Sequence, residues 1–476
     1  MFKILNFQEN NIFVNSSISL IILLGLTFRF YNLDYENLWF DEIFSFWVTD
    51  PSLSFSETFS RVKKTESIPF LYYYLIKICN TFFGYDPVVG RIFSASFGFL
   101  SIFTVSNLCK KFNNNKSCLL VLCLMSLNIF LIIYSQEMRV YIFTFFLNSI
   151  ALIFFFNLYQ EKKRQIFTRN FFLFLLFMLL AILSHPFSII VLGSLICFTF
   201  IDYFFFKIKN YKINTSLIIT SIFTLIFLFH YLGYVSTENV GWIEQPGLKF
   251  FSNFYFSNFF GSRLMGIIHL VILIFLSFYL RKSIIRNKKI IFLYIMLFLS
   301  YFIPLIYGYF LEPIIFPKYI IFVLIPIILI ISILIFHIEK KILRNFLILI
   351  LILFNLGNHF TESTFKQFFY EKVKFKPDFD TALEIIKNSE TKKMILYKEA
   401  DNQNQIFNAP LFNYVQVLLN NKNYEIDLLS NGLENHKGKV WYVCYGECYQ
   451  APLSFKILSE KFLSGGLKLN FLEKKQ

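Results

Sequence analysis

The segment Asn37-Leu38-Trp39-Phe40-Asp41-Glu42 places two adjacent carboxylates shortly after the first apolar run of the chain, Ser16 to Leu33. Charge is scarce around it, because 56% of the 476 residues are hydrophobic and only 16% are charged. An ionisable residue beside a membrane segment is costly and is a functional candidate by default. The rest of the sequence decides on which side of a membrane this pair lies and what it does there.

The composition predicts a polytopic membrane protein. The mean hydropathy is +0.57, and the apolar runs of the chain approach the roughly 20 residues that cross a bilayer. Eleven runs fall at about 14–32, 88–109, 118–134, 141–159, 170–184, 186–206, 213–233, 264–280, 290–309, 319–337 and 345–358. No basic segment precedes the first run and no small-residue cleavage site follows it, so we expect a first span rather than a signal peptide.

The Lys and Arg residues predict the orientation of the spans. The net charge of +15 comes from small clusters between apolar runs, which is typical of cytoplasmic loops and does not indicate nucleic-acid binding. Five connectors carry 3, 4, 3, 5 and 3 Lys plus Arg, and these are 110–116, 160–169, 207–212, 281–289 and 339–344. The short connectors between them carry one or none, so we expect the five basic connectors to be cytoplasmic.

One further run, Ile68 to Tyr85, leaves two topologies open. It begins with Pro69 and contains Lys77, whose charge would cost about 2.5–3.5 kcal/mol at mid-depth if the run spanned. In that case Asp41 is cytoplasmic. If the run lies in the interface instead, Asp41 shares the extracytoplasmic face with the connector Ser135 to Arg139, and the N-terminus is cytoplasmic. Pro69 and Lys77 favour this second arrangement.

The last part of the chain, residues 360–476, loses the long apolar runs. Its patterns predict helices at Asp380–Lys387 and Pro410–Leu419, and strands at Lys393–Tyr397, Tyr424–Leu429, Val440–Tyr445 and Leu467–Leu472. We therefore expect a small extracytoplasmic α/β domain at 360–476. Residues 1–359 are then an all-α membrane domain, with 33–87 as its first extracytoplasmic loop.

Asp41 and Glu42 are the first candidates for chemistry. An acceptor hydroxyl is a weak nucleophile at its ordinary pKa, so a direct displacement at a sugar needs a carboxylate within hydrogen-bond reach of it. The structural alternative is that the two acids stabilise the N-terminus of a juxtamembrane helix through its dipole. Both interpretations stay open on the residues alone.

A second polar group lies in Tyr134-Ser135-Gln136-Glu137-Met138-Arg139-Val140-Tyr141, between two runs that are almost wholly apolar. Gln136, Glu137, Arg139 and Tyr141 are candidates for substrate contacts, and the alternative is a polar turn whose Arg snorkels to lipid headgroups. Further candidates on the same face are Arg91, His185, Lys318 and Tyr319. Basic donors would stabilise a departing lipid phosphate, while each alone also fits an interface anchor.

The sequence contains no G-x-G-x-x-G motif, no P-loop and no metal-spaced Cys or His cluster. An enzyme that works outside the cytoplasm, without nucleotide cofactors, would need a donor activated by a lipid carrier. Cys444 and Cys448 either form a disulfide or stay free, and two ligands are too few for zinc.

Several of these residues, in order along the chain, resemble motifs of the bacterial GT-C glycosyltransferases, the group with protein O-mannosyltransferase-like and aminoarabinose transferase-like enzymes. Leu38–Glu42 resembles the first-loop acidic motif of that family, and Ile68–Tyr73 resembles its His-Pro-Pro-Leu-Tyr-Tyr segment. Arg91 with Ser94 resembles its Arg-x-x-Ser. Tyr134–Tyr141 matches closely, and Pro317–Tyr319 resembles a later Arg-Tyr pair in which Lys318 replaces Arg. The resemblance covers about Arg29 to Tyr319.

The resemblance implies a GT-C fold of about eleven transmembrane helices, with interfacial helices in the first loop. It implies an inverting transferase in the bacterial inner membrane that moves a sugar from a polyprenyl-phosphate donor to a glycan, lipid or protein hydroxyl outside. Asp41 is then the base, with Glu42 and Glu137 as its acidic neighbours. Arg139, Lys318 and Arg91 are phosphate or structural contacts, and Mg²⁺ or Mn²⁺ is an open expectation because some members use a metal.

Two rival functions also fit a polytopic membrane protein with these residues. A lipid-linked glycan flippase would need a charged central cavity, whereas the polar residues here gather at one face and the middles of the spans are nearly uncharged. An O-antigen polymerase or ligase would need a lipid-pyrophosphate oligosaccharide in place of a monophosphate sugar.

Overall fold

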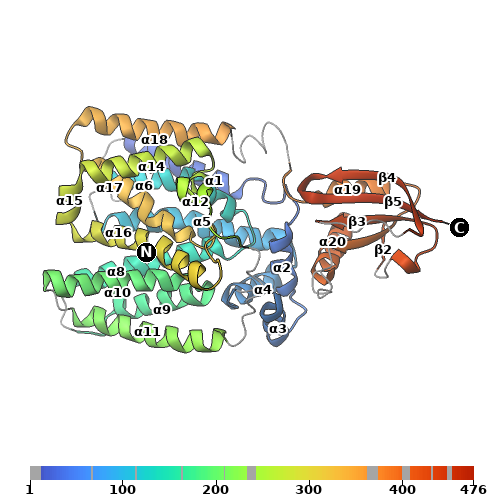
Figure 1. Cartoon of the computed structure of the whole chain (residues 1–476), viewed down its shortest axis with the longest axis horizontal. Helices are drawn as coiled ribbons and strands as arrows, with labels where there is room; N and C mark the ends of the chain where they lie inside the picture. Colours follow the sequence, from blue (N-terminus) through green and yellow to red (C-terminus); the bar gives the residue numbers. More distant parts are fainter. Residues whose placement is uncertain are drawn as a thin grey trace. The chain divides into compact units, whose positions relative to one another are not determined.

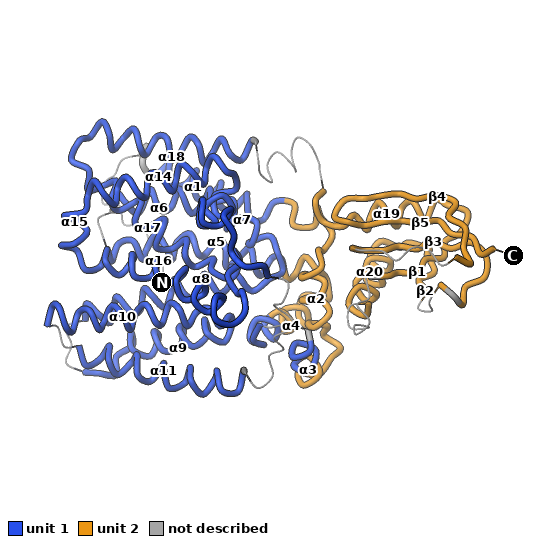
Figure 2. The backbone as a smooth tube through the Cα atoms, viewed as in Figure 1, with its two compact units in different colours: residues 1–31, 59–75, 91–366 blue, residues 32–58, 76–90, 367–476 orange. Residues whose placement is uncertain are grey.

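The structure, a computed structural model, describes residues 12–65, 68–112, 115–161, 165–207, 210–232, 243–361, 374–398, 408–429, 433–446 and 453–475. The chain forms two compact units (Figure 2). Unit 1 comprises residues 1–31, 59–75 and 91–366, and unit 2 comprises 32–58, 76–90 and 367–476. Two pieces of the first loop, one of which holds Asp41, therefore belong to the same compact unit as the C-terminal region.

Long apolar helices make up most of unit 1 (Figure 1). They are α1 (Ile12–Phe30), α5 (Pro87–Cys109), α6 (Asn115–Leu127) with α7 (Ile129–Ser135), α8 (Tyr141–Gln160), α9 (Arg169–Ser184), α10 (Ser188–Phe206), α11 (Tyr211–Leu232), α14 (Arg263–Tyr279), α16 (Lys288–Phe310), α17 (Leu324–Phe336) and α18 (Lys341–Thr361). Among the described residues, six helices are long and apolar enough to cross a membrane, and the bent pair α6–α7 is a seventh. Each of the eleven predicted runs corresponds to one of these helices or to the bent pair, so the prediction of an integral membrane protein is confirmed.

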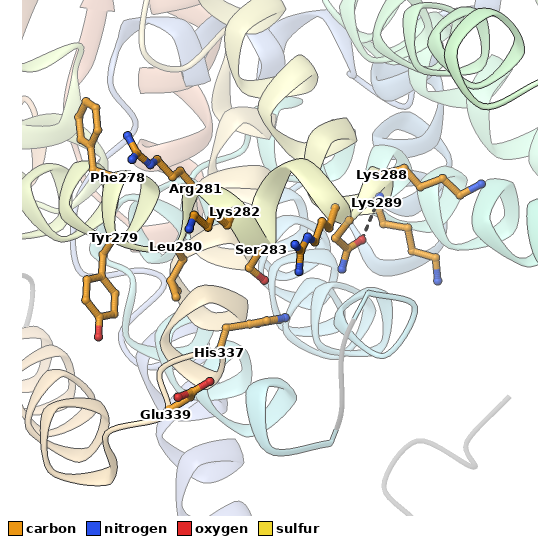
Figure 3. Close-up of a pocket in the computed structure, with 12 residues that line it drawn as sticks. Phe278, Tyr279, Leu280, Arg281, Lys282, Ser283, Lys288, Lys289, His337 and Glu339 are labelled. Carbon is orange, nitrogen blue, oxygen red and sulfur yellow. Dashed lines mark hydrogen bonds between the residues drawn. The ribbon is translucent and has the colours of Figure 1, made fainter.

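Shorter helices connect these elements. A 3-10 turn, η2 (Ile321–Val323), leads into α17, and α12 (Leu248–Asn253) and α13 (Phe256–Phe259) precede α14. The helix α15 (Arg281–Arg286) follows α14 and contributes basic side chains to a pocket (Figure 3). The run pattern did not predict these short helices, because each has fewer residues than two helical turns need to show a period.

The span predicted at 118–134 is a bent pair of helices, because the helix breaks at Asn128 and bends by 56° there. The Asn128 side chain accepts a hydrogen bond from Leu131 N–H and so starts α7. The break leaves the last carbonyls of α6 without helical partners. Arg29, fully buried at the end of α1, donates to the carbonyls of Met125 (2.8 Å) and Ser126 (3.2 Å). In the same way, His359 Nε2 lies 2.8 Å from the carbonyl of Leu127.

The segment Ile68 to Tyr85 contains α4 (Leu71–Phe83), whose 13 residues span only about 20 Å at 1.5 Å per residue. That is short of the roughly 30 Å of a hydrocarbon core, so the length of α4 favours the interfacial arrangement, which stays a prediction. Within unit 2, Lys77 donates to the carbonyl of Asp50 at 2.6 Å, and Asn80 donates to the carbonyl of Thr49 at 3.1 Å. The Lys77 side chain is buried, and a backbone carbonyl accepts a hydrogen bond from its charged group.

Unit 2 also contains α2 (Phe40–Val48), part of α3 (Phe55–Thr65) and a mixed five-stranded sheet. The strands are β1 (Lys393–Lys398), β2 (Asp427–Leu429), β3 (Lys439–Tyr445), β4 (Phe455–Leu463) and β5 (Leu467–Lys474), in the order β2-β1-β3-β5-β4. The pairs β1–β2 and β1–β3 are parallel, and β3–β5 and β4–β5 are antiparallel. With α19 (Phe379–Lys387) and α20 (Asn408–Lys422), this confirms the predicted small α/β fold.

Two details of the sheet differ from the prediction. The strand expected at Tyr424–Leu429 is shorter and begins at Asp427, and β4 was not predicted at all. Its register shifts between Ile457 and Ser459, and such a bulge interrupts the alternation by which a strand is recognised. Cys444, in β3, is disulfide-bonded, and Cys448 lies outside the described residues.

Candidate active site

The turn between α7 and α8 carries the second polar group and is held in place by α1 and α5. Ser135, the last residue of α7, is fully buried against Gly98 of α5. A side chain at position 98 would place its Cβ atom only 2.0 Å from Ser135 Oγ, so this close approach requires glycine. Gln136 donates from Nε2 to the carbonyls of Phe28 (3.0 Å) and Tyr31 (3.2 Å). Gln136 therefore binds the end of α1, a structural role that the sequence did not predict. Its substrate contact stays a prediction.

Two cations converge on the ring of Tyr141, the first residue of α8. The guanidinium carbon of Arg139 lies 5.7 Å from the ring centroid, and Lys318 Nζ lies 5.4 Å from it. Both side chains are at least 95% buried. A cation over an aromatic face is stabilised by the ring quadrupole, and more so when it is desolvated. The two charges therefore share one aromatic platform although they come from connectors about 180 residues apart in the sequence.

His185 and Tyr319 complete this arrangement. The His185 ring lies 5.9 Å from that of Tyr141 and 5.5 Å from that of Tyr319, centroid to centroid. Burial, followed by the charges of Arg139 and Lys318, lowers the pKa of His185 to about 3. Phe187 N–H donates to His185 Nδ1 at 3.2 Å, so the neutral imidazole carries its proton on Nε2. His185 is therefore a neutral donor beside two cations.

We call these five residues the cationic-aromatic cluster; its members are Arg139, Tyr141, His185, Lys318 and Tyr319. All five were predicted from the sequence as site residues, and all lie in unit 1. They come from the α7–α8, α9–α10 and α16–α17 connectors, which were all predicted to lie opposite the basic connectors. Two buried cations with aromatic neighbours and a neutral N–H donor form a chemical environment suited to a phosphate.

Glu137 and Arg91 are also buried in unit 1. Glu137 lies in the same turn as Arg139, whose backbone N–H donates to the Glu137 carbonyl at 2.8 Å. Arg91 lies on α5, one turn before Ser94, and Ser94 Oγ lies 3.4 Å from the hydroxyl of Tyr72. The predicted Arg-x-x-Ser segment is thus helical and packed against the Ile68–Tyr73 segment. The contacts of both residues with substrate stay predictions.

In unit 2, Asp41 and Glu42 lie in the first turn of α2. The N-terminus of a helix carries a partial positive charge that stabilises carboxylates, so the local fold agrees with the structural alternative for this pair. The two side chains nevertheless differ in environment. Asp41 is partly exposed, whereas Glu42 is fully buried.

Glu42 is paired with a residue that the sequence did not single out. Lys376 Nζ lies 2.8 Å from Glu42 Oε2, and the two residues are 334 positions apart. The hydroxyl of Tyr445, at the end of β3, lies near both acids. Its burial, followed by the charges of Asp41 and Glu42, raises the pKa of Tyr445 to about 12. Glu42 is thus a buried partner of the C-terminal region, and Asp41 is the more accessible carboxylate of the pair.

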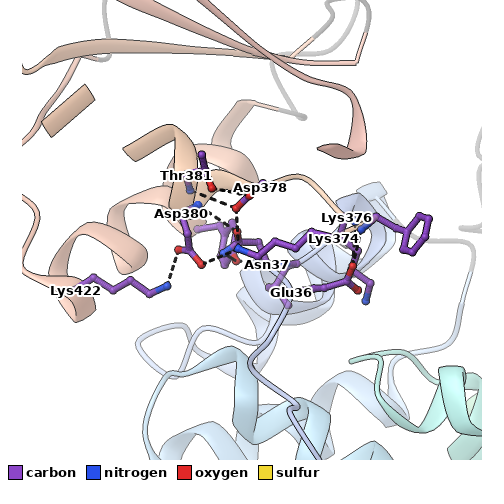
Figure 4. A network of polar contacts seen from close by, with 11 residues as sticks. Glu36, Asn37, Lys374, Lys376, Asp378, Asp380, Thr381 and Lys422 are labelled. Carbon is purple, nitrogen blue, oxygen red and sulfur yellow. Dashed lines mark hydrogen bonds and ion pairs between the residues drawn. The ribbon is translucent and has the colours of Figure 1, made fainter. Parts of the chain in front are cut away.

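A polar network fixes the chain that leads to Asp41 (Figure 4). Glu36 Oε1 accepts a hydrogen bond from Phe375 N–H at 2.7 Å, and Asn37 Oδ1 accepts one from Asp380 N–H at 3.2 Å. The hydroxyl of Tyr414, on α20, accepts Leu38 N–H at 2.9 Å. Segments from the first loop and the C-terminal region therefore hold the start of α2. Only the folded chain could identify these partners, because no local pattern pairs residues so far apart.

In the described part of the chain, His, Cys, Asp and Glu side chains do not gather in groups of three or more that could hold a metal ion. Mg²⁺ usually keeps several waters and needs only one or two carboxylates beside a substrate phosphate, so Mg²⁺ or Mn²⁺ stays an open expectation. Glu42 is already bound to Lys376, which leaves Asp41 as the more accessible carboxylate of the acidic pair.

The fold of the chain is that of the GT-C membrane glycosyltransferases. ArnT from Cupriavidus metallidurans bound to undecaprenyl phosphate is similar over 96% of this chain and 98% of its own, with a TM-score of 0.60 at 10% sequence identity. The apo state of the same protein gives a TM-score of 0.62 at 11% identity, with the same coverage. The archaeal oligosaccharyltransferase AglB from Archaeoglobus fulgidus, in complex with an inhibitory peptide and a dolichol-phosphate, gives 0.51 at 10% identity, over 90% of this chain and 69% of its own.

These likenesses establish the fold and confirm the GT-C architecture that the resemblance implied. By sequence, no model of a protein family and no curated protein matches the chain.

Proposed function

We propose that this protein is a membrane-embedded glycosyltransferase that moves a sugar from a polyprenyl-phosphate donor to a hydroxyl of a glycan, lipid or protein. The reaction takes place on the extracytoplasmic side of a bacterial inner membrane. Two of the proteins that share its fold, ArnT and AglB, are described with undecaprenyl phosphate and with a dolichol-phosphate. Those ligands belong to those proteins, and they support a lipid phosphate as the class of donor here.

The cationic-aromatic cluster is the observation that carries this proposal. Arg139 and Lys318 both lie within 6 Å of the Tyr141 ring and are buried. Burying two like charges together is expensive, and a bound dianion would offset that cost. The phosphate that leaves a glycosyl donor is such a dianion, and its charge grows as the bond to the sugar breaks.

The reaction that we propose is a direct displacement. The acceptor hydroxyl oxygen attacks the anomeric carbon from the side opposite the phosphate, so the configuration inverts. The bond between the anomeric carbon and the phosphate oxygen breaks, and its electron pair stays on that oxygen. Asp41 takes the hydroxyl proton. Arg139 and Lys318 stabilise the polyprenyl phosphate, and His185 Nε2–H donates a further hydrogen bond. Glu42 is a positioning residue that acts through α2.

Replacing Asp41 with asparagine tests the base. Purified full-length protein is incubated with a panel of polyprenyl-phosphate sugars and a hydroxyl acceptor, and released polyprenyl phosphate is measured. We expect Asp41→Asn to abolish release. Asp34→Asn is the matched control, because Asp34 is exposed in the same loop, and it should keep wild-type rates. Full activity of a folded Asp41→Asn variant would overturn the assignment.

Replacing Lys318 tests the phosphate contact. Hydrogen bonds to charged groups contribute about 1.5–3 kcal/mol, so Lys318→Met should raise the apparent KM for the donor by at least about tenfold. Lys318→Arg keeps the charge and should retain most of the affinity. If release instead requires a lipid-pyrophosphate oligosaccharide, the protein is a polymerase or ligase. If the lipid changes leaflet without losing its sugar, the protein is a flippase.

A further inference from the structure

A basic pocket lies in unit 1 where α14 ends and α16 begins (Figure 3). Its volume is about 1020 Å³, and its lining includes five basic residues from α15 and the start of α16, with His337 and Glu339 from the α17–α18 connector. It belongs to two of the connectors that the charge pattern predicts to be cytoplasmic. It is therefore separate from the cationic-aromatic cluster, whose connectors are predicted to lie on the other side.

The basic residues of this pocket divide into two sets. Lys288 lies 3.4 Å from the buried carboxylate of Asp202, and Lys289 donates to the carbonyl of Lys111 at 2.5 Å. These two lysines hold the helix ends together. The other set is Arg281, Lys282 and Arg286, all on α15. Within the described residues these three make no hydrogen bond or ion pair, and Arg281, Lys282 and Arg286 are exposed.

An exposed apolar stripe leads along α14 to the pocket. Its members recur every three or four residues on one face of the helix and are Leu264, Ile267, Val271, Ile274 and Phe278, with exposures of 60%, 46%, 57%, 47% and 74%. Phe278 also lines the pocket. On an apolar helix of a membrane protein, such a face contacts lipid chains. A lipid whose anionic headgroup occupies the pocket can therefore pack its acyl chains along the α14 stripe.

We propose that this pocket binds the phosphate headgroup of an anionic glycerophospholipid from the leaflet at this end of unit 1. The three α15 side chains supply the positive charge, and the α14 stripe packs along an acyl chain. Clusters of Lys and Arg at a membrane surface attract anionic headgroups, and a pocket between helices fixes the headgroup in one place. This inference does not depend on sugar transfer.

Native mass spectrometry of the full-length protein in detergent tests the proposal. The probes are dioleoyl phosphatidylglycerol, dioleoyl phosphatidylcholine with the same acyl chains, and inorganic phosphate. We expect preferential binding of the anionic lipid that weakens at 0.5 M salt, because screening acts on exposed charges. Equal binding of the two lipids, or displacement of phosphatidylglycerol by a tenfold excess of inorganic phosphate, would overturn the proposal.

Charge-removing variants localise the site. Each basic side chain near an anionic surface contributes about fivefold in affinity, so Arg281→Gln/Lys282→Gln/Arg286→Gln should lower the preference by at least about tenfold. The matched control is Lys116→Gln/Arg169→Gln/Lys207→Gln, which removes the same charge from exposed residues of other basic connectors. That control should bind like wild type. An equal loss in both variants, or no loss in the first, would contradict a pocket at α15.

Discussion

Replacing Lys376 with methionine should destabilise unit 2 more than replacing Glu42 with glutamine, although both changes remove the same ion pair. The pair is short, at 2.8 Å, but unequally placed, because the Lys376 side chain is 17% exposed and Glu42 is 0% exposed. Loss of Lys376 leaves a fully buried carboxylate without its cation. Loss of the Glu42 charge leaves an ammonium that can still reach water.

The magnitude follows from this asymmetry. Removing one partner of a buried ion pair costs about 3–5 kcal/mol, and the partial exposure of Lys376 reduces this to about 2–3 kcal/mol through solvent screening. Glu42→Gln keeps a hydrogen-bond acceptor and should cost about 1 kcal/mol. The double variant carries neither charge, so it should be more stable than Lys376→Met alone.

Thermal unfolding of the full-length protein, followed by tryptophan fluorescence, measures these differences. Three of the four tryptophans, Trp39, Trp47 and Trp441, lie in unit 2. At about 2–4 °C per kcal/mol for a domain of this size, Lys376→Met should lower Tm by about 4–12 °C. The control Lys422→Met breaks a more exposed pair with Asp380 and should change stability by less than about 1 kcal/mol.

Two outcomes would refute this reasoning. One is a Glu42→Gln variant that is as unstable as Lys376→Met, and the other is a double variant whose loss equals the sum of the two single losses. The same proteins separate positioning from chemistry. A Glu42→Gln variant that keeps sugar transfer, beside an inactive Asp41→Asn variant, agrees with Glu42 acting through α2.

Two further predictions concern unit 1. Gly98→Ala brings a Cβ to 2.0 Å from Ser135 Oγ, so it should lower the free energy of unfolding by about 1–3 kcal/mol and slow sugar transfer by moving the turn after Ser135. The control Gly193→Ala has no atom within 4 Å of the new Cβ and should change neither stability nor transfer. Equal Tm values for the two variants would contradict the close approach of Gly98 to Ser135. The pKa of His185 is lowered to about 3 from an unfolded value near 6.5, so its stabilising effect is complete above pH 6.5 and is lost as pH falls towards 3. His185→Gln should therefore show a smaller drop in Tm between pH 7 and pH 4 than wild type, and parallel curves would refute this.

The membrane fold could be predicted because its signals are local. An apolar run of about 20 residues has few alternatives to a spanning helix, and the charge of each short connector reports its side. Because successive connectors lie on opposite sides of the membrane, the sequence predicted that Arg139, His185 and Lys318 lie on the same, extracytoplasmic face. The structure confirms that they meet in one cluster. The resemblance added the GT-C fold, which the likeness to ArnT confirms.

The break at Asn128 shows where local signals fail. Residues 118–134 are apolar throughout, and nothing in them specifies a bend. The bend is stable because Arg29 and His359, from helices at opposite ends of the membrane domain sequence, bind the carbonyls that it frees. The charge of Arg29 inside the first apolar run indicated that it binds polar groups within the membrane domain. Only the packed structure identifies those groups as the carbonyls at the end of α6.

The sequence by itself predicted the apolar helices of the membrane domain and the residues of the cationic-aromatic cluster, because hydrophobic length and charge placement act through the bilayer and need no knowledge of contacts. The tertiary structure decided the roles of Asp41 and Glu42. These acids are neighbours in sequence, but helix geometry points their side chains in different directions, so Glu42 is buried against Lys376 while Asp41 stays accessible. The physical reason is that an ion pair across 334 positions forms only where packing brings its two charges together.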